Sequence, residues 1–200
     1  MNKVVDYYFA PQSPWAYFGH ARLAAIAKAS HAVIRVLPAD FGKVFAASGG
    51  LPLPKRAPQR QAYRLLELAR FRDALQVPLV AQPRYFPVAS DDAGKLIVAV
   101  DLHDGAEAAM RLSGAVFAAV WVQERDIASA QTLAELLTEC GLSGERLVQS
   151  RGQAVLDRYE ANTQTAIVAG VFGAPSYCID GEIFWGQDRL DFVERALQAD

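Results

Sequence analysis

The chain has 200 residues, of which 52% are hydrophobic and 21% charged, and its formal net charge is -2. This composition is typical of one globular domain, or of one domain with a large insertion, and the charge argues against nucleic acid as an electrostatic partner. No apolar run approaches the roughly 18 residues of a membrane span, and no hydrophobic signal region precedes the first strand-like segment, so we expect a cytoplasmic protein with no membrane partner.

The first 37 residues predict a strand, a helix and a second strand. Val4–Phe9 is β-branched and aromatic, a helical pattern follows over 15–29, and Ala32–Leu37 returns to strand-like composition. Ser13 before Pro14 is typical of a helix start, because a hydroxyl caps the first turn and proline fits the first helical position. This order of elements predicts that the two strands are parallel.

The middle of the chain is predicted to be helical. Residues 49–54 hold too many glycines and prolines for a helix or strand, and 78–87 should be an extended connection outside any central sheet. The segment 105–124 is apolar on more than one face, which predicts a helix in the middle of a bundle. The predicted helices of this block cover about 58–76, 91–102, 105–124, 129–140 and 144–149.

The end of the chain predicts a helix over 153–169, a β-hairpin and a final helix. The two strands of the hairpin are 176–179 and 182–185, and Asp180-Gly181 between them is a strong two-residue turn. The apolar face of the final helix carries Leu190, Val193 and Leu197.

The parallel pair at the front and the hairpin at the back each have too few strands to be stable alone. We therefore expect an α/β fold in which they join into one four-stranded mixed sheet with helices on both faces. Residues 1–38 and 151–200 would form this domain, and residues 39–150 an inserted all-helical domain. The junction of the two domains predicts a cleft, which is a common place for a small-molecule site.

The two cysteines, Cys140 and Cys178, form no Cys-x-x-Cys pair, and the three histidines show no metal-ligand spacing with them. We expect both cysteines to be buried as small hydrophobic side chains and no metal to be bound.

Two positions at opposite ends of the chain are candidates for a binding site. Ser13 lies where a helix N-terminus favours an anion, and with no general base in the local sequence it suits a hydrogen-bond donor better than a nucleophile. The plainer interpretation is a helix cap. The peptide bond of Ala174-Pro175, just before the hairpin, is either trans or a cis bond that exposes the Ala174 backbone to a ligand.

The chain carries four further motifs: Asp-Tyr-Tyr-Phe at 6–9, Ser-Pro-Trp-Ala-Tyr at 13–17, Gly-Val-Phe-Gly-Ala-Pro at 170–175 and Phe-Trp-Gly-Gln-Asp-Arg-Leu at 184–190. Together they resemble the 2-hydroxychromene-2-carboxylate isomerase family, which is similar to kappa-class glutathione transferases and, more distantly, to DsbA thiol oxidoreductases. The resemblance is strong near both ends and patchy between them, where 119–127 matches best. It implies a thioredoxin-like fold with an inserted helical domain, glutathione as cofactor, and a homodimer.

By position, the resemblance implies that Ser13 hydrogen-bonds the sulfur of glutathione. It implies that Ala174 pairs its backbone with the cysteinyl part, next to a cis Pro175. Gln187 and Asp188, at the start of the last helix, would hold the γ-glutamyl end.

Arg60 falls where the family often has a lysine for the glycyl carboxylate of glutathione. Two plainer interpretations stay open: Arg60 is one of several solvated charges in 55–64, and Asp188 only caps the last helix. The candidates to stack on an aromatic substrate are Tyr17, Tyr85 and Trp185.

The implied reaction is cis–trans isomerisation of a ring-opened chromene carboxylate, or of a similar small aromatic carboxylate, as in aromatic hydrocarbon catabolism. Glutathione would add reversibly as a thiolate, so that the double bond becomes single, rotates and is restored. The alternatives are a kappa-like glutathione transferase or peroxidase, which consumes glutathione, and a non-enzymatic binding module. A DsbA-type oxidoreductase fits less well, because residues 13–16 occupy the place of its Cys-x-x-Cys. Gly50 and the 83–87 loop depart from the family pattern, which leaves open a family member with another substrate.

Overall fold

The computed structural model describes residues 3–198 as four strands, nine α-helices and two short 3₁₀ helices. All predicted elements are present, with their ends shifted by a few residues at most. In chain order they are β1 Val4–Phe9, α1 Pro14–Ala29, β2 Val33–Pro38, α2 Phe41–Ser48, η1 Leu53–Lys55, α3 Pro58–Leu75, α4 Asp91–Asp104, α5 Ala106–Trp121, α6 Ala130–Glu139, α7 Glu145–Gln149, α8 Gln153–Val168, β3 Ser176–Ile179, β4 Glu182–Trp185, η2 Gln187–Arg189 and α9 Leu190–Gln198.

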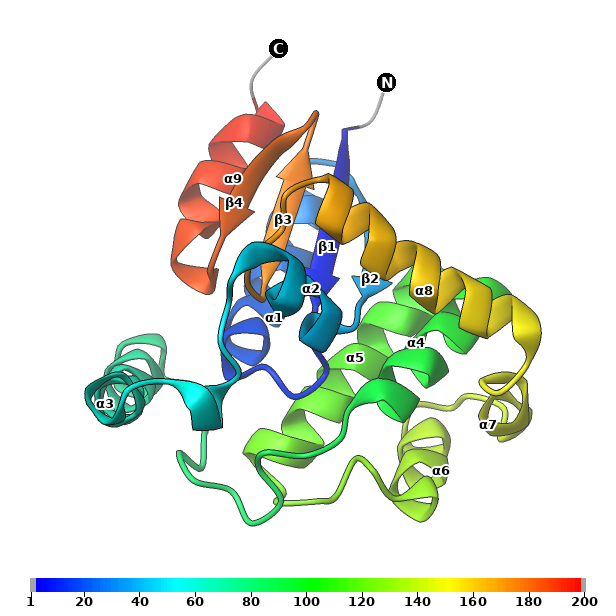
Figure 1. Ribbon diagram of the computed structural model, residues 1–200. Coiled ribbons are helices and arrows are strands. Elements are labelled where there is room, and N and C mark those ends of the chain that lie inside the picture. The colour runs from blue at the N-terminus through cyan, green and yellow to red at the C-terminus, as the bar shows by residue number, and fades with distance from the viewer. Residues whose placement is uncertain (1–2, 199–200) are drawn as a thin grey trace.

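The sheet joins the two ends of the chain, as predicted (Figure 1). Its strand order is β2-β1-β3-β4; β1 runs parallel to β2 and antiparallel to β3, and β3 and β4 form the hairpin. Tyr7 in the middle of β1 lies opposite Val36 of β2 and Tyr177 of β3. The carboxyl end of β1 and the start of β3 therefore lie next to each other, which places Ser13 and Ala174 in the same region.

Helices cover both faces of the sheet, because successive side chains of a strand point to opposite sides. On one face Tyr7 and Phe9 belong to the main core with Leu23 of α1 and Phe117 of α5. On the other face Tyr8 and Cys178 pack with Val44 of α2 and Ala166 of α8. The predicted mixed sheet with helices on both faces is confirmed.

Helix α5 is buried on most sides, as the sequence pattern predicts. It contacts α1, α4, α6 and β2, and its residues Phe117 and Trp121 are fully buried in the core that also contains the sheet residues. Burial of each such large apolar side chain stabilises the fold by about 1.5–3 kcal/mol. The helical block thus packs directly on the sheet, and the division at 38 and 151 into two domains stays a prediction.

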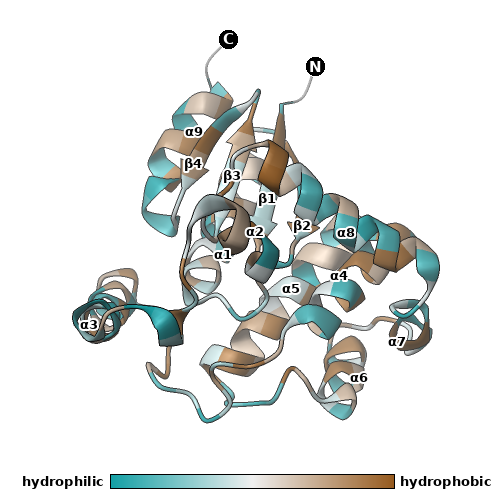
Figure 2. Cartoon of the chain, in the orientation of Figure 1, coloured by the Kyte–Doolittle hydropathy of each residue, from teal (hydrophilic) through white to brown (hydrophobic). Residues whose placement is uncertain are grey.

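The surface helices have a different character. Helix α8 buries Val155, Tyr159 and Ala166 and exposes most of its other residues. Helix α3 stands at the edge of the molecule, and Leu68 is its fully buried side chain. In Figure 2 both helices carry hydrophilic and hydrophobic colours, as expected for helices with one face in solvent.

Helix α2 is missing from the helices predicted above, and the structure corrects this. The Asp40 carboxylate caps it by accepting from the backbone N–H groups of Gly42 (2.8 Å) and Lys43 (3.2 Å). Gly49 ends it with a positive φ of 75°. Its eight residues are too few to establish a clear helical period, although both end signals stand in the sequence.

Two local predictions at the hairpin are confirmed. Asp180 and Gly181 both have positive φ angles, 50° and 86°, as a tight two-residue turn requires. The Ala174-Pro175 peptide bond is cis. Across residues 3–198, no helix is long and apolar enough to cross a membrane, and no three His, Cys, Asp or Glu side chains gather as a metal site would require.

Candidate active site

Ser13 and Ala174 meet although 161 residues separate them in sequence. The Ser13 hydroxyl donates to the Ala174 carbonyl oxygen over a long 3.4 Å and accepts from the Ala16 backbone N–H at 3.2 Å. Ser13 is the N-cap of α1, as predicted, with only 8% of its surface exposed. Neither partner is a base, so the hydroxyl is a donor that can turn from a weak internal bond to an arriving anion.

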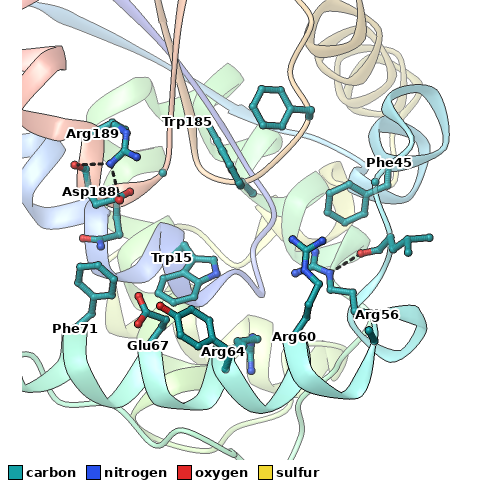
Figure 3. A pocket seen from close by; sticks show the side chains of 18 of the residues that line it. Trp15, Phe45, Arg56, Arg60, Arg64, Glu67, Phe71, Trp185, Asp188 and Arg189 are labelled. Atoms are coloured by element: carbon teal, nitrogen blue, oxygen red, sulfur yellow. Dashed lines mark hydrogen bonds and ion pairs between the residues drawn. The ribbon is translucent and has the colours of Figure 1, made fainter.

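A cavity of about 940 Å³ opens beside this pair. Its walls come from Trp15 of α1, from parts of the segment 45–71 and from parts of the segment 172–189, including Ala174. In Figure 3, α3 forms one wall, Trp15 lies at the centre and Trp185 lies opposite α3. The cavity therefore lies between the predicted thioredoxin-like part and the start of the predicted insertion, where a cleft is expected.

Gln187 of η2 lines the cavity and is 2% exposed. Arg22 of α1 donates from Nη1 to its side-chain Oε1 at 2.9 Å and to its backbone oxygen at 3.0 Å. The amide is held in one orientation, in which Nε2 is buried without a hydrogen-bond partner. A buried donor without an acceptor is energetically unfavourable, so a ligand oxygen that accepts a hydrogen bond from Nε2 would be bound favourably.

Asp188 and Arg189 follow Gln187 at the same end of the cavity (Figure 3). Their side chains pair at 2.6 Å between Arg189 Nη1 and Asp188 Oδ2, and both are about half exposed. A ligand ammonium group can still bind the remaining lone pairs of the Asp188 carboxylate.

Trp185 lines the cavity together with Phe172, and the two rings meet edge to face with centroids 4.8 Å apart. Both are large, half-exposed aromatic side chains at the opening. Gly173 makes room for the indole, because a Cβ there would lie 2.2 Å from Trp185 Nε1. This wall can contact a planar, apolar ligand.

Three arginines, Arg56, Arg60 and Arg64, line the wall near α3. Arg56 donates to the Leu51 carbonyl at 2.7 Å, and burial together with the Arg60 charge lowers the pKa of Arg56. The side chains of Arg60 and Arg56 lie at the end away from Asp188 and Arg189 in Figure 3. The cavity is therefore polarised, with unpaired positive charge at one end, which suits anionic ligands.

The structure gathers most of the candidate site residues around one cavity. Arg60, Ala174, Trp185, Gln187 and Asp188 line it. Ser13 and the cis Pro175 are not among the lining residues, and both directly adjoin Ala174. Gly50, which departs from the family pattern, lines it as well.

Tyr17 and Tyr85 are not among the residues that line the cavity. The Tyr17 hydroxyl instead donates to the Pro78 carbonyl at 2.6 Å, and the Tyr85 ring lies against Arg84. Their predicted contact with an aromatic substrate stays a prediction.

Phe172 and Arg64 line the cavity but were not predicted to do so. Phe172 stands between Val171 and Gly173 in one of the quoted motifs, and an aromatic residue beside a loop glycine could have singled it out. No local sequence pattern marks Arg64, because its contact with the cavity depends on how α3 packs against the rest of the protein.

Neither cysteine has the properties of a reactive thiol. Cys178 is buried, and burial together with the Asp6 charge raises the pKa of its thiol to about 11. Cys140 is half-buried, and burial raises its pKa as well. At pH 7 only about one Cys178 side chain in ten thousand would be a thiolate.

We expect iodoacetamide at neutral pH to leave the activity of the folded protein unchanged, since thiolate is the reactive form. Mass spectrometry should find Cys178 unmodified in the folded protein and labelled after unfolding in guanidinium, which is the control. Activity lost in proportion to Cys178 labelling would mean that a cysteine takes part in the reaction.

Comparisons with known proteins agree on the family. The model of the DSBA-like thioredoxin domain matches residues 4–198. The 2-hydroxychromene-2-carboxylate isomerase of Pseudomonas putida is 31% identical over 97% of this chain and 94% of its own, and that of Sphingobium xenophagum is 28% identical over 98% and 99%. A solved structure of a 2-hydroxychromene-2-carboxylate isomerase superposes with a TM-score of 0.81 at 27% identity, over 98% of this chain and 94% of the other.

Proposed function

Because the chain belongs to the DSBA-like thioredoxin-domain family and, within it, to the 2-hydroxychromene-2-carboxylate isomerases, it is an isomerase, and we propose that it uses glutathione to isomerise a small aromatic carboxylate. The observation that carries the glutathione part is the contact of Ser13 with Ala174, which lines the cavity. A hydroxyl donor and the partly buried backbone of a cavity-lining residue lie side by side, and a thiol-containing peptide can use both.

The polar groups of the cavity fit glutathione. Gln187 offers a buried N–H donor that lacks an acceptor, and Asp188 beside it offers a carboxylate for an ammonium group. Arg60 offers a guanidinium for a carboxylate at the other end. In this proposal Gln187 and Asp188 hold the γ-glutamyl end, Ala174 pairs with the cysteinyl backbone, and Arg60 holds the glycyl carboxylate.

Bound glutathione would supply a reversible nucleophile, whose addition to a conjugated alkene converts the double bond into a rotatable single bond. The task of the protein is to keep that sulfur ionised. A cysteinyl thiol has a pKa near 8.5, and lowering it by one to two units takes about 1.4–2.7 kcal/mol. One hydrogen bond to a charged group contributes about 1.5–3 kcal/mol, so the Ser13 hydroxyl at the N-terminus of α1 is sufficient.

The remaining wall of the cavity would position the substrate. Trp185 and Phe172 present aromatic surface at the opening. A flat aromatic ring can pack on them while its reactive carbon faces Ser13 and Ala174. Their packing restricts the substrate to few orientations, which lowers the entropic part of the barrier.

The direct test gives the purified protein 2-hydroxychromene-2-carboxylate and an amount of glutathione well below that of the substrate. The proposal expects many turnovers and no loss of free thiol. Loss of glutathione in proportion to turnover would instead indicate a kappa-like transferase or peroxidase. Reduction of insulin disulfides would indicate a DsbA-type oxidoreductase, and calorimetry without glutathione binding would refute the cofactor assignment.

We also propose a cytoplasmic homodimer that acts in aromatic catabolism, on the strength of the family resemblance. Light scattering of the protein eluting from a size-exclusion column tests the oligomeric state: one species of twice the chain mass of 21.8 kDa is expected. A species of the chain mass at micromolar concentration would refute the dimer.

A further inference from the structure

Arg64 is an unusual cation for a cavity wall. Its guanidinium carbon lies 4.8 Å from the centre of the Phe86 ring and 5.7 Å from that of Trp121. Its Nη2 atom is buried and has no hydrogen-bond partner. The guanidinium is therefore stabilised by cation–π contacts on one side, and its Nη2 atom lacks a hydrogen-bond acceptor. The residue also lines the cavity.

The α3 wall of the cavity has more positive than negative charge available for a ligand. The lining carboxylates are already paired: Glu67 with Arg70 at 2.5 Å and Asp188 with Arg189 at 2.6 Å. Within residues 3–198, neither Arg60 nor Arg64 forms an ion pair with a carboxylate. Two guanidinium groups on one helix, one turn apart, are thus available for anions that come from outside the chain.

The guanidinium of Arg64 stays protonated at neutral pH, but no carboxylate in the described part of the chain neutralises its charge. Burial, with a smaller contribution from the Arg56 charge, lowers the pKa of Arg64 to about 10. The side chain stays protonated at neutral pH, while it has lost part of its hydration. A carboxylate that reaches the guanidinium would replace that hydration with a charge-assisted hydrogen bond.

We propose that Arg64 binds the carboxylate of the aromatic substrate and so determines which substrates are accepted. This inference rests on the proposed function, in which Arg60 is occupied by the glycyl carboxylate of glutathione. The reaction then brings two carboxylates to the α3 side of the cavity. Arg56 donates to the Leu51 carbonyl, which leaves Arg64 as the second guanidinium without a hydrogen-bond acceptor among residues 3–198. Figure 3 places Arg64 below Trp15, on the α3 wall between Glu67 and Arg60. A carboxylate bound there leaves the rest of the substrate near Trp15, in the first turn of the helix that Ser13 caps.

A purely structural role makes a different prediction. If Arg64 only packs α3 against Phe86 and Trp121, its replacement by an apolar side chain of similar length changes thermal stability. It then lowers the apparent kcat through the amount of folded protein and leaves the KM unchanged. Binding of a carboxylate predicts a selective loss, confined to ligands that carry this group.

The experiment compares Arg64→Met with Arg64→Lys and with Arg72→Met, a partly exposed arginine of the same helix that, like its partner Asp73, lies outside the cavity lining. Arg64→Met should raise the KM for 2-hydroxychromene-2-carboxylate by about 10- to 100-fold, as expected for one lost charge-assisted contact. Arg64→Lys should recover part of the loss, because it restores charge but not the fork of donors. Arg72→Met should behave as the unmodified protein, and the Kd of glutathione measured by calorimetry should stay within about twofold in all three.

A second measurement tests the same site by equilibrium binding, without catalysis. Salicylate, an aromatic carboxylate, should compete with substrate and bind the glutathione-loaded protein by calorimetry, and phenol, which lacks the carboxylate, should bind much more weakly. Arg64→Met should remove this difference. If that variant does not fold, Arg64→Gln repeats the comparison with a polar side chain.

The two proposals fail in distinguishable ways. An unmodified protein that does not turn over the chromene carboxylate contradicts the proposed function, whereas equal salicylate and phenol affinities in it contradict the carboxylate site. An active protein in which Arg64→Met leaves the KM unchanged, or weakens glutathione instead of the substrate, overturns the assignment of Arg64.

Discussion

Replacement of Ser13 by alanine is expected to lower kcat by about 10- to 100-fold, while the KM for glutathione changes little. In the proposed mechanism the hydroxyl hydrogen bond that Ser13 makes to the Ala174 carbonyl at 3.4 Å would turn to the ionised sulfur of glutathione. Loss of about 1.4–2.7 kcal/mol of thiolate stabilisation corresponds to this loss of rate, since each 1.36 kcal/mol is a factor of ten. The pKa of bound glutathione, followed by the ultraviolet absorbance of its thiolate, should rise by about one to two units in Ser13→Ala.

The control for this variant is Ser129→Ala. Ser129 caps α6 as Ser13 caps α1, by accepting from a backbone N–H three residues on, at 3.4 Å in α6 and 3.2 Å in α1. Both substitutions should cost about 0.5–2 kcal/mol of stability through the lost cap. Only Ser13→Ala should lose activity, so equal kcat values for the two variants would refute the role of Ser13.

The fold is predictable from the sequence because its elements carry strong local signals. Asp180-Gly181 between two short strands specifies a hairpin, and Ser13-Pro14 specifies a helix start; both are found. The pairing of the two half-sheets follows from the small number of strands in each. Helix α2 could not be predicted in this way. Its caps, Asp40 and Gly49, are single residues, and such residues indicate a helix only when a helical pattern lies between them.

The candidate site is predictable where a residue lies in a motif at the start of an element, as Ser13 does before α1, Ala174 before β3 and Gln187 in η2. It is not predictable where side chains from distant segments decide the geometry. The orientation of the Gln187 amide depends on Arg22, 165 residues away. The availability of Arg64 depends on rings contributed by the 78–90 connection and by α5. Tyr17 illustrates the same point, because Pro78 engages its hydroxyl away from the cavity lining.

Replacement of Gln187 by glutamate is expected to weaken glutathione binding by about 100-fold or more. The substitution keeps the shape of the side chain and leaves Arg22 a partner for it at 2.9 Å, so the fold should tolerate the new charge. It converts the buried Nε2 donor into an acceptor that faces the carboxylate of the γ-glutamyl end. A lost hydrogen bond to a charged group, about 1.5–3 kcal/mol, is then added to repulsion between two like charges.

Gln149→Glu is the matched control, because Gln149 accepts from Arg146 at 2.8 Å in the same manner but lies outside the cavity lining. Calorimetry should show weakened glutathione binding for Gln187→Glu alone. At saturating glutathione its kcat should stay close to that of the unmodified protein, because Ser13 still stabilises the sulfur. A Kd within threefold of the original would refute the placement of the γ-glutamyl end at η2, and a fall in kcat with unchanged Kd would show that Gln187 acts on the reaction and not on binding. Ser13→Ala and Gln187→Glu together thus separate ionisation of the sulfur at α1 from glutathione binding at η2. A loss of activity measured at one glutathione concentration would not separate them.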